Sequence, residues 1–187
     1  MLPKIEPLKT GITNNLNSYY FIWPYYPKRF TVTPEEETYR NSIYAFKDGG
    51  GNPLFYEQIG KLVNKIIRLN FEENTEVYLC IIPASTTLKT IARFNKFCAE
   101  VVKKSNVING YDLISNKLDR NPNHMIDGGG DADIIKYITR NDIRNKNIIL
   151  VDDVITRGRS YDQISQELKK RGAKKIIGFF IGKTTHK

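Results

Sequence analysis

The sequence predicts an α/β protein of three layers, in which a doubly wound, mainly parallel sheet lies between helices. Short apolar runs predict buried strands, and longer segments with apolar residues three or four apart predict helices. The two kinds of segment alternate, which is typical of a parallel sheet with helical crossovers. The chain has 187 residues, which suits one domain. Within that domain we distinguish an aromatic N-terminal arm (1–35), expected to form a small hood, from a core (36–187).

The N-terminal arm is rich in proline, tyrosine and asparagine. Its densest part, residues 19–27, reads YYFIWPYYP. Proline interrupts helices and the interior of sheets, so we expect no regular helix and no central strand there. Disordered segments are poor in aromatic residues, so we expect an ordered arm packed on the core. The alternative is a stacking platform for a partner or a nucleotide.

The first helix begins at the sequence TPEE, residues 33–36, which offers a threonine cap, a proline at the first position and acids in the first turn. It runs to about Phe46, before three consecutive glycines. The next expected elements are a helix over 53–69, a strand over 75–83, a helix over 87–104 and a strand over 110–114.

The second half contains the clearest elements. Residues 115–132 are polar and rich in glycine and asparagine, which predicts a long mobile loop. The run NIILV, residues 147–151, predicts a buried strand. A helix over 160–171 follows and ends at a glycine, and a last strand is expected over 175–181.

Composition excludes several classes of protein. The hydrophobic share of 40% and the charged share of 26% are those of a globular protein. No apolar run has the length of a membrane span, and the N-terminus lacks a secretory pattern, so we expect a cytoplasmic protein. Cys80 and Cys98 lie among apolar neighbours, which favours buried free thiols. The cysteines and histidines have no zinc-site spacing.

The formal net charge is +9. A basic surface of this kind suits nucleic acid, and it equally suits a polyanionic small molecule. Charge alone leaves both partners open.

The segment NIILVDDVITRGRSY, residues 147–161, contains the candidate chemistry. A buried strand brings Asp152 and Asp153 to its carboxyl end, where open parallel sheets bind ligands. A turn follows and leads into a helix. That turn offers hydroxyls, a glycine and free N–H groups at a helix N-terminus, all of which suit a phosphate monoester. Its residues are Thr156, Arg157, Gly158, Arg159 and Ser160. Carboxylates beside a phosphate site suit a ribose 5-phosphate. The alternative is an acidic strand end followed by a surface turn.

This pattern resembles the motif that binds 5-phosphoribosyl-1-pyrophosphate (PRPP) in type I phosphoribosyltransferases. The segments 43–49 and 77–98 are similar to the ComF-like branch of that family, in which a strand ending in proline leads to a pyrophosphate-binding turn. Two features depart from the relatives. The cysteine zinc ribbon of many ComF-like proteins is absent from the sequence, and Thr156 stands where the 6-oxopurine enzymes carry an aspartate. The threonine argues against hypoxanthine or guanine as the acceptor.

The resemblance implies roles for further residues. Backbone N–H groups of Ala84 and Ser85, with Lys89 or Arg93, would bind pyrophosphate. Mg²⁺ would be held by Asp152 and Asp153, directly or through water. A loop that closes over the site would contribute Lys117, Arg120 and His124, for each of which a solvated loop position is the alternative.

Two functions follow from these expectations. The first is Mg²⁺-dependent transfer of the 5-phosphoribosyl group from PRPP to a nitrogenous acceptor, with release of pyrophosphate. The second is a non-catalytic module that senses PRPP or a nucleotide, or that regulates through nucleic acid. A homodimer is expected from the relatives, and no segment of the sequence specifies the acceptor.

Overall fold

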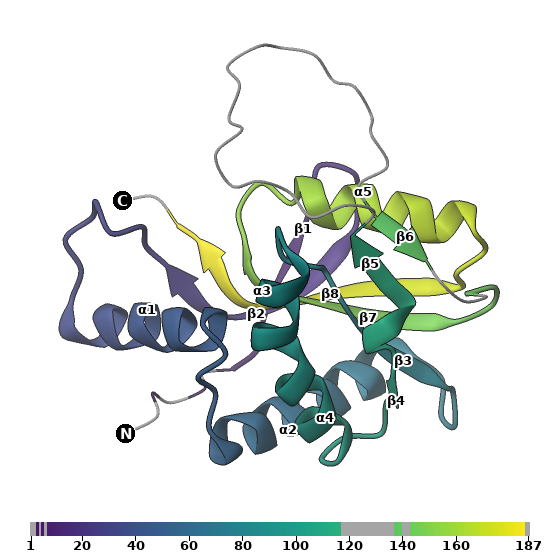
Figure 1. The fold of residues 1–187 in the computed structure, drawn as a ribbon, viewed down its shortest axis with the longest axis horizontal. Coiled ribbons are helices and arrows are strands. Elements are labelled where there is room, and N and C mark those ends of the chain that lie inside the picture. The colour runs from purple at the N-terminus through teal and green to yellow at the C-terminus, as the bar shows by residue number, and fades with distance from the viewer. Residues whose placement is uncertain (1–2, 4, 6, 117–136, 140–142, 186–187) are drawn as a thin grey trace, which may run out of the picture.

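The molecule is a three-layer α/β structure built on a six-stranded sheet, which confirms the predicted fold class (Figure 1). The computed structural model describes residues 3, 5, 7–116, 137–139 and 143–185. The strand order is β1-β2-β8-β7-β3-β4, and only the edge strand β1 runs antiparallel to its neighbour. The strands are β1 (Lys9–Ile12), β2 (Ser18–Tyr25), β3 (Val77–Ile81), β4 (Ile108–Asn109), β7 (Asn147–Ile155) and β8 (Lys175–Thr184).

Helices cover both faces of this sheet (Figure 1). One face carries α1 (Pro34–Lys47), α2 (Pro53–Asn70) and a continuous helical stretch made of α3 (Thr87–Thr90), a π-helical turn (Ile91–Asn95) and α4 (Lys96–Val102). The other face carries α5 (Arg159–Lys170). Two apolar clusters fill the spaces between the layers. A small separate sheet pairs β5 (Ile114–Asn116) with β6 (Tyr137–Thr139).

The helix boundaries follow from local sequence. Thr33 caps α1 through a reciprocal capping box with Glu36, as expected from the TPEE sequence. Asn52 caps α2 by accepting a hydrogen bond from the N–H of Phe55. Gly172 takes a φ of 90° just beyond α5, where a left-handed residue ends a helix. Each of these helices lies within a residue or two of its predicted range.

The aromatic segment is a strand inside the sheet, so the prediction that prolines keep it out of the centre is wrong. β2 lies between β1 and β8. Its proline, Pro24, lies beyond the pairing with β1, which reaches only to Phe21. The carbonyl of the next residue, Tyr25, accepts a bond from Thr185 on the β8 side. Neighbouring residues of a strand direct their polar groups to opposite sides, so the missing N–H of Pro24 points where no partner strand remains.

Two other expectations need correction. The predicted strand over 110–114 is a 3₁₀ turn, Tyr111–Leu113, between β4 and β5. Gly110 donates to the carbonyl of Leu79 and accepts from the N–H of Leu113, so the chain turns there instead of extending. The predicted mobile loop over 115–132 begins within β5, and residues 117–132 lie outside the described part of the chain. The division into an arm of 1–35 and a core stays a prediction.

Among the described residues, no helix combines the length and the apolar content that crossing a bilayer requires.

Trp23 tests whether the aromatic segment belongs to the core. Its side chain is fully buried, and its ring stacks on Tyr39 at 5.6 Å and on Phe55 at 6.2 Å between centroids. We expect Trp23→Ala to lower the free energy of unfolding by about 3–5 kcal/mol, since a buried ring is replaced by a cavity. Urea unfolding should be followed by circular dichroism, because Trp23 is the only tryptophan. Leu69→Ala, at a 59% exposed position, should change stability by less than about 0.5 kcal/mol.

Candidate functional site

The two adjacent carboxylates lie where β7 continues past the end of β3. The pairing of these strands ends at Ile81 and Val151, and a last bond joins the N–H of Ile82 to the carbonyl of Val151 at 2.8 Å. β7 then runs on to Ile155, paired only with β8. The strand is therefore longer than its predicted range of 147–151. Asp152 and Asp153 stand in this extension, and the side that β3 vacates is open.

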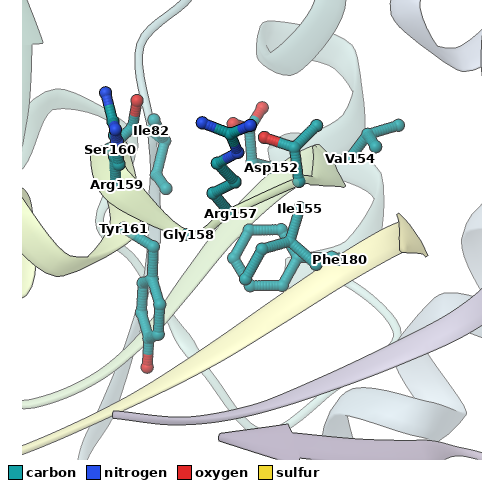
Figure 2. A pocket seen from close by; sticks show the side chains of 11 residues that line it. Ile82, Asp152, Val154, Ile155, Arg157, Gly158, Arg159, Ser160, Tyr161 and Phe180 are labelled. Atoms are coloured by element: carbon teal, nitrogen blue, oxygen red, sulfur yellow. The ribbon is translucent and has the colours of Figure 1, made fainter. Parts of the chain in front are cut away.

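Two cavities adjoin at Asp152. The first, of about 170 Å³, is bounded by the end of β7 and the turn into α5 (Figure 2). The second, of about 410 Å³, is bounded by Asp152, Asp153 and the turn that follows β3. Asp152, Ile82 and Ser160 line both cavities, whereas Asp153 lines only the second. The two spaces form one crevice at the carboxyl edge of the sheet. A crevice was expected there because two acids stand next to each other at the end of the predicted strand.

The turn into α5 has the geometry of an anion site. Gly158 has a φ of 77° and occupies the N-cap position, and no side chain caps the helix there. The first N–H groups of this 12-residue helix therefore lack a capping side chain. Figure 2 shows Arg157, Arg159 and Ser160 on the same side of the turn as Asp152, with Tyr161 pointing the opposite way. Thr156 also lines this cavity. All five predicted residues of the phosphate turn are thus brought together.

The β1–β2 hairpin holds this turn in place, which the sequence did not indicate. Asp162, in the first turn of α5, is buried and accepts hydrogen bonds from Thr13 Oγ1 at 2.6 Å and Asn17 Nδ2 at 2.7 Å. Lys169 Nζ donates to Asn17 Oδ1 at 2.7 Å. A Cβ added at Gly158 would lie 2.9 Å from Thr13 Cγ2, so the hairpin packs directly on the phosphate turn.

The residues predicted to bind pyrophosphate all line the second cavity, but they differ in exposure and in whether they already have a partner within the protein. Ser85 is half-buried, Lys89 is exposed, and both line the cavity. The N–H of Ala84 donates to Thr90 Oγ1 at 3.0 Å, so this group already has a partner. Arg93 is buried and turned toward the two aspartates. Lys47 and Asp48, at the end of α1 and within the segment 43–49 that resembles the ComF-like branch, also line the cavity, although no role was predicted for either.

Asp152 has a strongly perturbed acidity. Burial raises its pKa well above the usual aspartate value, and the neighbouring charge of Asp153 raises it further. The N–H of Asp153, which donates to Asp152 Oδ1 at 2.8 Å, and the charge of Arg93 act in the opposite direction. A pKa displaced by burial and a charged neighbour in a cleft is a mark of functional sites, although structural networks produce it too.

The end of the aromatic strand lies near the same carboxylates. Burial and the hydrogen bond between the hydroxyls of Tyr25 and Tyr44, at 3.0 Å, raise the pKa of Tyr25 to about 12. The charge of Asp153 contributes to this rise. β2, which ends at Tyr25, is separated from β7 by one strand, β8.

The donor set fits magnesium shared with a ligand. Carboxylate oxygens are the donors that Mg²⁺ prefers, and it is commonly held by one or two carboxylates together with substrate phosphates. In the part of the chain that the structure describes, no three Asp, Glu, His or Cys side chains converge on one point. Asp152 could supply one oxygen at the crevice, and the rest would have to come from the ligand and water. The predicted loop residues Lys117, Arg120 and His124 lie outside the described residues.

The chain matches no protein-family model and no curated protein sequence. It is similar in structure to a hypoxanthine-guanine phosphoribosyltransferase from Bacillus anthracis, with 14% identity and a TM-score of 0.46 over 72% of this chain and 80% of that one. It is also similar to the hypoxanthine-guanine phosphoribosyltransferase from Leishmania tarentolae in complex with GMP, with 11% identity and a TM-score of 0.40 over 75% of this chain and 65% of that one. A third similar structure is a hypoxanthine phosphoribosyltransferase from Staphylococcus aureus, with 12% identity and a TM-score of 0.44 over 72% of this chain and 76% of that one. At these values the functional assignment depends on the site residues.

Two glycines at opposite ends of α5 separate backbone strain from phosphate binding. Gly158 and Gly172 have φ values of 77° and 90°. Alanine at either position should cost about 1–2 kcal/mol of folding stability, because a Cβ disfavours the left-handed conformation, and Gly158→Ala should cost more because its Cβ would lie 2.9 Å from Thr13 Cγ2. Only Gly158→Ala should also weaken the binding of ribose 5-phosphate, measured by titration calorimetry, since Gly172 is remote from the crevice. Equal affinity in the two variants would contradict the assignment of this turn.

The raised pKa of Asp152 predicts a pH-dependent stability. The folded state binds this proton more tightly than the unfolded state, so the free energy of unfolding should fall as pH rises from the normal aspartate range through the raised pKa. One proton gives a slope of at most about 1.4 kcal/mol per pH unit.

Asp152→Asn removes this charge, so the variant should lose that contribution and be more stable than the wild type at neutral pH. Urea unfolding between acidic and neutral pH measures both effects. The matched control is Asp112→Asn, at an exposed carboxylate outside the crevice, which should leave the profile of the wild type unchanged.

Proposed function

We propose that this protein binds PRPP with Mg²⁺ and transfers its 5-phosphoribosyl group to a nitrogen nucleophile, releasing pyrophosphate. The observation that carries the proposal is the position of Asp152, on the wall shared by the phosphate-turn cavity and the larger cavity beside Lys89. A carboxylate at that wall can reach the ribose hydroxyls while a phosphate occupies each side. Few small ligands other than PRPP require this order of groups.

The residues have distinct roles in the proposed reaction. The N-terminus of α5, with Thr156 and Ser160, binds the 5-phosphate, because unpaired N–H groups and the helix dipole favour an anion. Asp152 accepts hydrogen bonds from the ribose hydroxyls and fixes the orientation of C1. Ser85 and Lys89 bind the pyrophosphate on the other side. Magnesium, when bound with PRPP, neutralises charge on the leaving group.

The chemical step exchanges one bond at C1. The bond from C1 to the pyrophosphate oxygen breaks and its electron pair leaves with pyrophosphate. The lone pair of the acceptor nitrogen forms the new bond to C1, and a proton on that nitrogen passes to solvent. The negative charge of Asp152 stabilises the positive charge that develops on the ribose ring as the leaving group departs.

The acceptor is proposed to be a base other than hypoxanthine or guanine. Thr156 lines the phosphate-turn cavity at the position where the 6-oxopurine enzymes that the motif resembles carry an aspartate. A threonine hydroxyl cannot supply the negative charge of that carboxylate. The ComF-like relationship, a homodimer and a cytoplasmic location stay predictions.

Two contacts favour a second candidate, a module that binds PRPP without turnover. The N–H of Ala84 is already bonded to Thr90, and Arg93 is paired with the aspartates. Both were expected to bind pyrophosphate, so the leaving group has fewer ready partners than the motif implies. Pyrophosphate release with a panel of nitrogenous bases distinguishes the candidates: a sensing module binds PRPP but releases none.

Titration calorimetry of PRPP tests the proposal. We expect PRPP to bind more tightly with Mg²⁺ than without it, and more tightly than ribose 5-phosphate. Asp152→Asn should weaken binding about 10- to 150-fold, which corresponds to the loss of one hydrogen bond to a charged group at about 1.5–3 kcal/mol. A basic surface that binds nucleic acid would instead show a steep dependence of affinity on salt and no dependence on Asp152.

The control is Asp48→Asn, which removes an exposed carboxylate from the wall of the larger cavity. By electrostatics alone, removing negative charge near a polyanion strengthens its binding. Asp48→Asn should therefore leave PRPP affinity unchanged or raise it. If Asp152→Asn also raises the affinity, Asp152 makes no contact with the ligand and the proposal fails.

A further inference from the structure

Arg93 is the buried cation of the crevice. Its residue is 8% exposed, and its Nη1 lies 2.7 Å from Asp153 Oδ2 and 3.8 Å from Asp152 Oδ1. At the opposite side of the guanidinium, Nε donates to the carbonyl of Lys47, the last residue of α1, at 3.1 Å. The side chain is thus anchored between the end of α1 and the end of β7. A buried arginine fixed in this way differs from an exposed residue that waits for a ligand.

The helix that presents Arg93 has an irregular geometry at this point. Residues 91–95 form a π-helical turn between α3 and α4. Such turns are rare and occur frequently at functional sites. Here the turn lets Arg93 and its neighbour Phe94 both be buried. A Cβ at Gly49, whose φ is 81°, would collide with the carbonyl of Ala92, so the chain after α1 packs closely on this turn.

The two aspartates are not equivalent with respect to Arg93. Asp153 Oδ1 accepts from the N–H of Val154 at 2.6 Å, and its buried Oδ2 has no hydrogen-bond partner among the described residues but lies 2.7 Å from Arg93 Nη1, so the guanidinium charge is what compensates this oxygen. Its side chain is 10% exposed and lines one cavity. The side chain of Asp152 is 19% exposed and lines both cavities. The geometry separates a structural carboxylate from a carboxylate that is open to ligand.

We propose that Arg93 is the fixed counter-ion of Asp153, which positions that carboxylate and leaves Asp152 alone to meet the ribose hydroxyls and the divalent cation. The identity of the ligand in this inference rests on the proposed function, whereas the ion pair itself does not depend on it. Its consequence is that the ligand-free carboxylate pair, already balanced by one buried positive charge, does not recruit Mg²⁺. The metal reaches the site together with PRPP. Arg93 is then a positioning residue and does not bind pyrophosphate.

The test measures thermal unfolding in the absence of PRPP, with and without millimolar MgCl2 at constant ionic strength. The wild type should show no shift of Tm with Mg²⁺. Arg93→Met leaves two adjacent carboxylates without their counter-ion, so its Tm should be several degrees lower without Mg²⁺ and should rise when Mg²⁺ is added. Lys89→Met is the control: it removes an exposed cation from the same cavity and should leave both the Tm and the absence of a shift unchanged.

A double-mutant cycle tests the pair directly. Asp153→Asn removes the closer partner of the buried arginine and leaves only Asp152 Oδ1 at 3.8 Å, so it should also lower Tm, since the loss of a partner of a buried charge is destabilising. The double variant Arg93→Met/Asp153→Asn removes both charges and should recover most of the lost stability. The double variant should also show no rise of Tm with Mg²⁺, in contrast to Arg93→Met. The conservative change Arg93→Lys keeps the charge and should show no Mg²⁺ response.

Each outcome decides the inference. Additive effects in the cycle, or no Tm shift with Mg²⁺ in Arg93→Met, overturn it. If Arg93→Met does not fold, recovery of folding in the double variant supports the ion pair, and failure of both variants to fold overturns it. None of these measurements contains PRPP, so failure of the cycle leaves PRPP binding by the wild type untouched. Conversely, an intact cycle in a protein that does not bind PRPP refutes only the proposed function.

Discussion

Two adjacent carboxylates at the end of a buried strand are electrostatically costly, and the architecture around them reduces that cost. Like charges close together in a partly desolvated wall disfavour ionisation of both. β7 relieves part of this burden by extending past β3, which leaves Asp152 at an open edge of the sheet. Arg93 relieves the rest by its contact with Asp153. The crevice exists because the sheet is staggered at this point, and Asp152 stays open to it while Asp153 is paired with Arg93.

The phosphate turn depends on contacts that are distant in sequence. The left-handed Gly158 and the uncapped start of α5 form a polar turn without a local side-chain cap. Thr13 and Asn17 fix it through Asp162, which lies 149 and 145 residues away along the chain. The N-terminal hairpin thus has two functions in the fold. It extends the sheet through β2, and it holds the N-terminus of α5 against β7.

Local pattern predicted much of this structure. The capping box at Thr33 and the left-handed Gly172 mark helix ends by interactions within a few residues, and they were found where the sequence places them. The turn around Gly158 was predicted for the same reason, since strand, turn and helix follow one another directly, whereas the crevice beside Asp152 also depends on where β3 ends. Features that are determined within one short segment can be predicted from the sequence of that segment.

Features set by distant partners could not be predicted in this way. Pro24 is tolerated in the sheet only because β1 is too short to reach it, and the length of one strand says nothing about the length of its neighbour. Arg93 has the sequence context of a surface helix, and the structure instead buries it within the π-helical turn. Asp162 reads as an ordinary acid in the first turn of a helix until the hairpin contacts it. In each case tertiary contact overrides local pattern.

The distribution of charge in the crevice has a consequence for the metal. A site that bound Mg²⁺ unaided would need more oxygen donors than one open carboxylate, since this cation keeps a full octahedral shell. Asp152 lines the wall of the crevice, whereas the charge of Asp153 is balanced by Arg93. The remaining donors would come from the ligand and water, and Lys47 and Lys89 favour a polyanion in this cavity. The donor set of the described residues is incomplete by itself, which is the basis of the proposal that the metal binds together with the ligand.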